Sequence, residues 1–257
     1  MRDFLLGVSY LPRGFRLLWA PGLRRYVALP ILINILVFGL LFWGGLQLYG
    51  DLLAYLLPNP ERWSGNGWLD RTLLFLTTVL YWLLWPLFLI AAAVLMFYSF
   101  TLVANLIGSP FNGMLSAKVE LISRGALPPE QDQSLAKELV VSVAGELRKL
   151  GYFAKLAIPL LVLFFIPVVN LLASALWAVF GAWALAVEYM DYPMGNRGMR
   201  FQQEREALRR RRLLALGFGF AVLAMTLVPV LNLLAMPTGV IAATLLWLDE
   251  FSESAET

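Results

Sequence analysis

Two adjacent arginines, Arg24 and Arg25, stand directly before the first long apolar run of the chain. Pro21 and Gly22 precede them, and a Pro-Gly pair at this place predicts a break followed by the first turn of a new helix. The backbone N–H groups of Gly22 and Leu23 would then face outward at the positive end of that helix. Because helix-start N–H groups and planar guanidinium donors both bind oxyanions, the segment predicts anion binding.

The arginine pair also has a simpler interpretation. Arginines at the edge of a membrane segment hold that edge in the cytoplasm and contact anionic lipid headgroups, without any specific ligand. Anchoring and anion binding therefore stand as alternatives for Arg24 and Arg25.

The chain contains neither cysteine nor histidine. This excludes disulfides, thiolate metal sites, cysteine nucleophiles, histidine–carboxylate metal clusters and Ser-His-Asp triads. The Gly-x-x-x-x-Gly-Lys-Ser/Thr phosphate loop is also missing, so the chain does not hydrolyse nucleotides through such a loop. The apolar runs hold no paired carboxylates, and Ser109 has no evident base. The sequence therefore predicts no enzyme, no metal site and no cofactor.

The composition is that of an integral membrane protein. Of the 257 residues, 60% are hydrophobic and only 14% are charged, whereas an average soluble domain has about 25% charged residues. Four runs without a charge exceed the roughly 20 residues that cross the hydrocarbon core as a helix. These runs are residues 26–50, 72–117, 156–187 and 213–248. The strand alternation of a transmembrane barrel is absent, so the predicted class is all-α, with one membrane domain over residues 1–257.

The elements that must position the arginine pair are an amphipathic segment and a membrane helix. Residues 1–20 mix apolar side chains with arginines and predict an amphipathic N-terminal segment at the membrane surface. Two long transmembrane helices are expected over residues 25–49 and 73–106, and the second should end at the turn-forming residues 108–110. Two shorter spans kinked at Pro86 are the alternative to one long second helix.

The basic residues predict the topology. Of the 20 Lys and Arg residues, 18 lie before residue 26, in residues 118–155 or in residues 197–212, and only two lie in the 51–71 loop. By the positive-inside rule, both termini and the helical segment 118–155 are cytoplasmic. The Arg-rich run within 197–212 would suit nucleic acid in isolation, but beside a membrane segment it predicts contact with anionic lipid and no nucleic-acid partner.

An internal repeat lies in the last two apolar runs. The pattern Pro-Val-x-Asn-Leu-Leu-Ala occurs at residues 167–173 and again at residues 229–235, 62 positions later. A Pro-x-x-Asn turn in the middle of such a run leaves arms that are short for full spans, which predicts re-entrant helical hairpins over residues 156–188 and 213–248. Two short helices that both cross the membrane are the alternative.

Five polar side chains are candidates for the pore or for turns. They are Asn105, Ser109, Asn112, Asn170 and Asn232. The first three surround the expected end of the second span, where they either cap a helix stop or offer an anion neutral donors that release it easily. The two others lie at the hairpin turns, where capping is the favoured role over pore lining.

Several of these motifs together resemble one family. The Gly-Leu-Arg-Arg of residues 22–25, the Ser-Pro-Phe-Asn of residues 109–112, the Lys-Val-Glu of residues 118–120 and the two Pro-Val-x-Asn turns closely resemble the CysZ family of bacterial sulfate permeases. The resemblance covers nearly the whole chain. It implies two long membrane helices and two hemi-penetrating helical hairpins in a homo-oligomer.

The resemblance also implies a function and a site. The function is channel-like uptake of sulfate across the bacterial inner (plasma) membrane for cysteine biosynthesis, with sulfite as a further candidate ligand. The implied sulfate ligands are the N–H groups of Gly22 and Leu23 and the guanidinium groups of Arg24 and Arg25, and none of these four positions departs from the family pattern. The rival function is a non-transporting membrane scaffold or regulatory subunit whose arginines only contact lipid headgroups.

Overall fold

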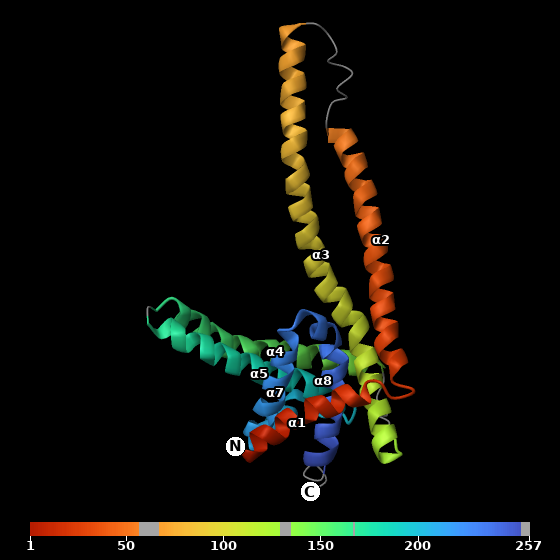
Figure 1. The fold of residues 1–257 in the computed structure, drawn as a ribbon, viewed down its shortest axis with the longest axis vertical. Coiled ribbons are helices and arrows are strands. Elements are labelled where there is room, and N and C mark those ends of the chain that lie inside the picture. The colour runs from red at the N-terminus through yellow and green to blue at the C-terminus, as the bar shows by residue number, and fades with distance from the viewer. Residues whose placement is uncertain (57–66, 129–134, 167, 253–257) are drawn as a thin grey trace. The chain divides into compact units, whose positions relative to one another are not determined.

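The structure is a computed structural model that describes residues 1–56, 67–128, 135–166 and 168–252. These residues form α-helices and contain no strand, which confirms the predicted all-α class (Figure 1). The helices are α1 (Arg2–Leu17), α2 (Arg24–Leu56), α3 (Trp68–Arg124), α4 (Leu135–Phe164), α5 (Val169–Gly195), α6 (Phe201–Arg210), α7 (Arg212–Thr226) and α8 (Pro229–Glu250).

The chain divides into two compact units. The first contains residues 1–27 and 110–257, and the second contains residues 28–109. The first unit therefore holds α1, the start of α2, the C-terminal part of α3 and α4 to α8. A single membrane domain remains a prediction.

The second unit consists of apolar stretches of α2 and α3. Its described apolar side chains are largely exposed, among them Trp43, Phe75 and Trp82 at 64%, 66% and 67%. Exposed apolar side chains along a whole helix are expected where lipid, and not water, surrounds it. Within the described residues, Trp68–Ala91 of α3 is long and apolar enough to cross a membrane, as are Val169–Gly195 and Pro229–Glu250 in the first unit.

Helix α3 continues well past its predicted end. It passes through residues 108–110 without a break and ends only at Arg124, which differs from the expected end at residue 106. The reason lies in packing, because Leu115, Ser116 and Val119 repeat at helical spacing and are buried in the first unit. A buried face of this kind outweighs the local turn preference of glycine, serine and proline.

The core of the first unit forms where α1 packs on α7 and α8, and where α5 packs on α7. Tyr10 of α1 and Phe218 of α7 are almost fully buried there. The close approach of α1 and α7 requires glycine at position 217. A Cβ atom on Gly217 would lie 2.0 Å from the carbonyl oxygen of Phe4. Small residues allow helix backbones to approach in this way.

Both repeated segments form helical hairpins. The turn between α4 and α5 includes Phe165 and Val168, and the turn between α7 and α8 includes Leu227 and Val228. The first arm is longer than expected, because α4 begins at Leu135 and absorbs the helical stretch assigned to the cytoplasmic segment.

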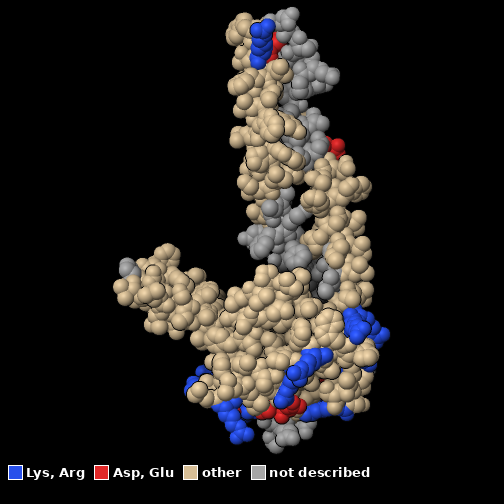
Figure 2. All heavy atoms as spheres, in the orientation of Figure 1, with Lys and Arg blue, Asp and Glu red and all other residues tan. Residues whose placement is uncertain are grey.

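The hairpin turns present apolar side chains. Phe165, Val168, Leu171, Leu227 and Val230 are each at least 75% exposed. Figure 2 shows that the end of the α4–α5 hairpin carries no charged residue on the face in view, while Lys and Arg gather at the other end of the first unit. Entry and exit of the hairpins on one side of the membrane remains a prediction.

Candidate anion-binding site

The predicted anion site is a tight turn between α1 and α2. The side chain of Leu23 is fully buried and holds the turn on the core of the first unit. Gly22 has a φ of +92°, a backbone conformation that residues with a Cβ atom rarely adopt. Gly22, Arg24 and Arg25 are exposed, so one buried leucine fixes a turn whose polar groups face outward.

The open N–H groups of the turn differ in part from those predicted. The N–H of Leu23 donates to the carbonyl oxygen of Ala20 at 3.3 Å. The N–H groups of Gly22, Arg24 and Arg25 have no acceptor among the described residues. The structure thus leaves three donors open, and two of them belong to the arginines themselves. The general rule that the first N–H groups of a helix lack partners is the signal that could have identified them.

The two guanidinium groups have no acidic partner within the part of the chain that the structure describes. The Nε of Arg24 donates to the carbonyl oxygen of Trp19 at 3.0 Å. The guanidinium of Arg25 lies 5.1 Å from the ring centroid of Tyr26 and reaches its hydroxyl at 3.4 Å. Both positive charges are therefore held near the turn without being neutralised there, which favours an anionic ligand.

Lys149, which is buried, and Arg197, which is partly buried, have acidic partners instead. The Nζ of Lys149 lies 2.6 Å from a carboxylate oxygen of Asp191 and 3.3 Å from one of Glu188. Burial alone would lower the pKa of Lys149, but these carboxylates outweigh it and hold the pKa above its usual range. Arg197 pairs in the same way with Glu120. The first set of contacts connects α4 to α5, and the second connects the segment between α5 and α6 to α3. Neither Lys149 nor Arg197 is left with an unpaired positive charge for a ligand.

The five candidate polar residues are not gathered at the turn by any described contact. The side chain of Asn112 is buried and donates to the Tyr192 hydroxyl at 3.2 Å, which connects α3 to α5. Asn170 and Asn232 are exposed, and the N-cap positions beside them are Val168 and Val228. The side chains of the two remaining candidates, Asn105 and Ser109, lie outside the described residues.

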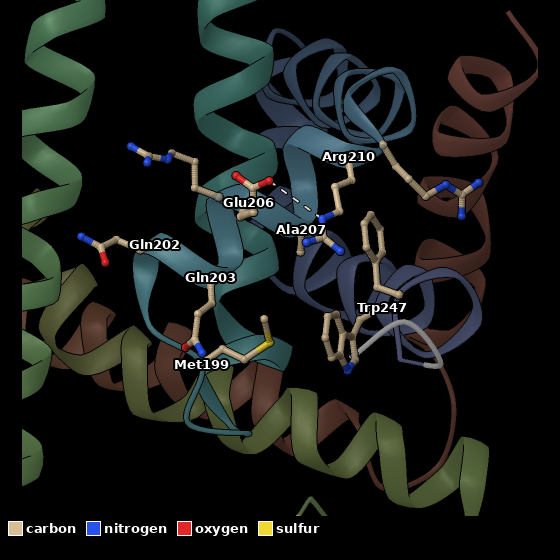
Figure 3. Close-up of a pocket in the computed structure, with 10 residues that line it drawn as sticks. Met199, Gln202, Gln203, Glu206, Ala207, Arg210 and Trp247 are labelled. Atoms are coloured by element: carbon tan, nitrogen blue, oxygen red, sulfur yellow. Dashed lines mark ion pairs between the residues drawn. The ribbon is translucent and has the colours of Figure 1, made fainter. Parts of the chain in front are cut away.

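A hollow lies between α6 and the end of α8. Its volume is about 510 Å³, and Met199, Gln203 and Trp247 form part of its wall (Figure 3). The one ion pair drawn in Figure 3 joins Arg210 to Glu206 at 3.8 Å. Arg205, Arg210 and Arg211 all line this hollow. Arg210 and Arg211 have acidic partners, Glu206 and Glu250, so Arg205 is the one arginine of the wall without an acidic partner among the described residues.

The described helices that are apolar enough to cross a membrane define the class, a helical membrane protein. Its turn before α2 places open helix-start N–H groups beside two cations without acidic partners among the described residues, an arrangement that suits an anion. Comparison with known proteins is consistent with this class. The chain belongs to the family described as Sulfate transporter CysZ/Etoposide-induced protein 2.4, which matches residues 10–237.

Curated relatives cover almost the whole chain. The sulfate transporter CysZ of Pseudomonas paraeruginosa is 40% identical over 253 residues, which cover 98% of both chains. The sulfate transporter CysZ of Pseudomonas syringae pv. tomato is 41% identical over 250 residues, covering 96% of this chain and 93% of its own. That of Pectobacterium atrosepticum is 38% identical over 253 residues, covering 98% and 87%. The resemblance seen in the motifs is thereby confirmed.

Proposed function

We propose that this protein takes up sulfate across the bacterial inner membrane as a channel-like permease and supplies cysteine biosynthesis. The proposal rests on relatives that are named sulfate transporters and match this chain over nearly its full length. The observation that supports a sulfate site at particular residues is the turn before α2. This turn has three open N–H groups and two guanidinium groups without acidic partners among the described residues.

Sulfate binds at this turn through complementary donors. The N–H groups of Gly22, Arg24 and Arg25 point to the ligand at the positive end of α2, and the guanidinium groups close around it. The N–H of Leu23 joins them when its 3.3 Å hydrogen bond to Ala20 lengthens. Since both termini are cytoplasmic in this proposal, the turn acts on exit or on regulation of flux rather than on first capture.

The hairpins enter the membrane without crossing it, and neighbouring subunits of a homo-oligomer together complete the ion path. Helix α7 has 15 residues, or about 22 Å, which is shorter than the ~30 Å hydrocarbon core. In α4 only residues 156–164 separate Lys155 from the turn, which is about 14 Å at helical rise. Arms of these lengths support re-entrant hairpins.

Uptake of radioactive sulfate into proteoliposomes tests the function. Purified wild-type protein should give sulfate flux above empty vesicles, and the double variant Arg24→Ala/Arg25→Ala should lose at least about tenfold of it, because two charge-assisted contacts are removed. Arg209→Ala/Arg210→Ala is the matched control, since it removes two exposed arginines far along the chain from the turn. Absence of flux in the wild type would favour the non-transporting scaffold instead.

A further inference from the structure

Lys118, near the C-terminal end of α3, lies against the turn that we propose as the sulfate site. A Cβ atom built on Gly22 would have the Cε atom of Lys118 as its nearest neighbour, at 3.9 Å. The ammonium group is one bond beyond that carbon. Both residues belong to the first compact unit of the chain, although they are 96 positions apart in the sequence.

The position of Lys118 follows from the packing of α3. Leu115 and Val119 are fully buried and belong to the same core cluster as Leu23 of the turn. Lys118 precedes Val119 and is only partly buried, so its stem lies at the edge of this cluster. A long aliphatic stem at such an edge carries the charged end toward the surface, which here is the surface beside Gly22.

Lys118 has no counter-ion in the described part of the chain. No ion pair or hydrogen bond joins its ammonium group to a described residue, whereas Lys149 contacts three carboxylates. A partly buried cation beside open N–H donors favours a negative partner, and no described residue provides one.

We infer that Lys118 is a third cationic ligand of the bound anion and that it favours a dianion over a monoanion. This inference rests on the proposed sulfate site. Arg24 and Arg25 provide directional forks, and the ammonium adds a point charge from a different helix. A bound sulfate would then connect the start of α2 to the end of α3, and its two negative charges would offset two of the three positive charges, where a monoanion would offset one.

Isothermal titration calorimetry on the full chain in detergent tests the inference. Lys118→Met should weaken sulfate binding about tenfold, from the loss of one charge a few ångströms from the ligand. The affinity for perchlorate, a tetrahedral monoanion, is measured by competition with sulfate, and Lys118→Met should lower it much less. Lys118→Arg should retain most of the sulfate affinity. Lys155→Met, the same change at an exposed lysine of α4, should bind as the wild type does.

A measurement on the wild-type protein tests the inference even if Lys118→Met does not fold. The rate of acetylation of each lysine is measured by mass spectrometry, with and without sulfate at a concentration on the order of 10 mM. Bound sulfate should slow the acetylation of Lys118 but not that of Lys155. Equal rates with and without sulfate would overturn the inference, as would equal loss of sulfate and perchlorate affinity in Lys118→Met.

The outcomes also separate this inference from the proposed site. If Arg24→Ala lowers sulfate affinity and Lys118→Met does not, the turn binds sulfate without the lysine, and the inference is wrong. If neither substitution lowers affinity, the turn itself is not the sulfate site.

Discussion

At the scale of single residues, Gly22 determines the shape of the turn before α2. Its φ of +92° allows the N–H groups of Gly22, Arg24 and Arg25 to stay open while Leu23 is buried. Glycine is the residue that adopts this conformation without steric cost. In the proposed site, the backbone of the turn is therefore as important as the two arginines.

Gly22→Ala should strain the turn by roughly 1–2 kcal/mol, the usual cost of a left-handed conformation for a residue with a Cβ atom. The expected result is lower sulfate affinity by calorimetry and a lower thermal midpoint. Gly151→Ala is the control, because a Cβ atom there meets open space on exposed α4, and alanine should be neutral or slightly stabilising. Unchanged affinity in Gly22→Ala would show that the glycine is not needed for binding.

The raised pKa of Glu204 in α6 predicts that the stability of the folded protein falls as the pH rises. Burial, followed by the negative charge of Asp191, raises the pKa of Glu204 to about 9 from 4.5, and Lys149 opposes this only in part. The folded protein therefore binds a proton that the unfolded chain releases near its ordinary pKa, so the stabilisation is complete below about pH 4.5 and is lost as the pH rises through about 9.

The thermal midpoint of the wild type in detergent should fall as the pH rises between these limits. Glu204→Gln places a neutral side chain of similar size at this position and should make the thermal midpoint less dependent on pH. Glu206→Gln, at an exposed neighbour on the same helix, should leave the slope as it is. A slope in Glu204→Gln as steep as that of the wild type would contradict the assignment.

At the scale of elements, Lys149 connects the two arms of the first hairpin. Its ammonium, with a side chain only 5% exposed, extends from α4 to Asp191 and Glu188 of α5 and also contacts Glu146. Removal of such a buried partner leaves several carboxylates close together without compensation.

Lys149→Met should therefore destabilise the protein by roughly 2–4 kcal/mol, somewhat less than a fully buried pair because the carboxylates are partly exposed. Thermal unfolding followed by circular dichroism measures the change. The same substitution at the exposed Lys155 should shift the midpoint little. Equal midpoints for the two variants would show that the Lys149 contacts do not hold the hairpin together.

At the scale of the whole molecule, the open structural point is the path of the hairpins through the membrane. Both turns carry exposed apolar side chains. One arm of each hairpin has a short apolar part, namely α7 and residues 156–164 of α4, whereas α5 and α8 are long enough to cross. The exposed apolar turns and the short arms support turns that stay within the lipid.

Cysteine labelling tests this topology, because the chain has no cysteine of its own. Single cysteines at Val168 and Pro229 should resist a membrane-impermeant maleimide added from outside the cell. Trp68→Cys, at the expected outer loop, should react from outside, and Gln202→Cys on α6 should react only after the membrane is opened. Reaction of Val168→Cys and Pro229→Cys from outside would show that the hairpins cross.

The sequence by itself determined the all-α membrane class and the two hairpin turns, and it predicted anion binding for the segment before α2. These features depend on local signals, namely long charge-free runs, a repeated Pro-x-x-Asn pattern and a Pro-Gly break before two arginines. Local signals act over a few residues, so they can be seen without the fold.

Only the tertiary structure decided which groups meet at the turn. It carries α3 through residues 108–110, because burial of Leu115 and Val119 outweighs local turn preference. That continuation brings Lys118 beside Gly22, and the turn geometry occupies the N–H of Leu23 while it leaves those of the arginines open. Such contacts depend on packing between residues distant in sequence, which no local pattern specifies.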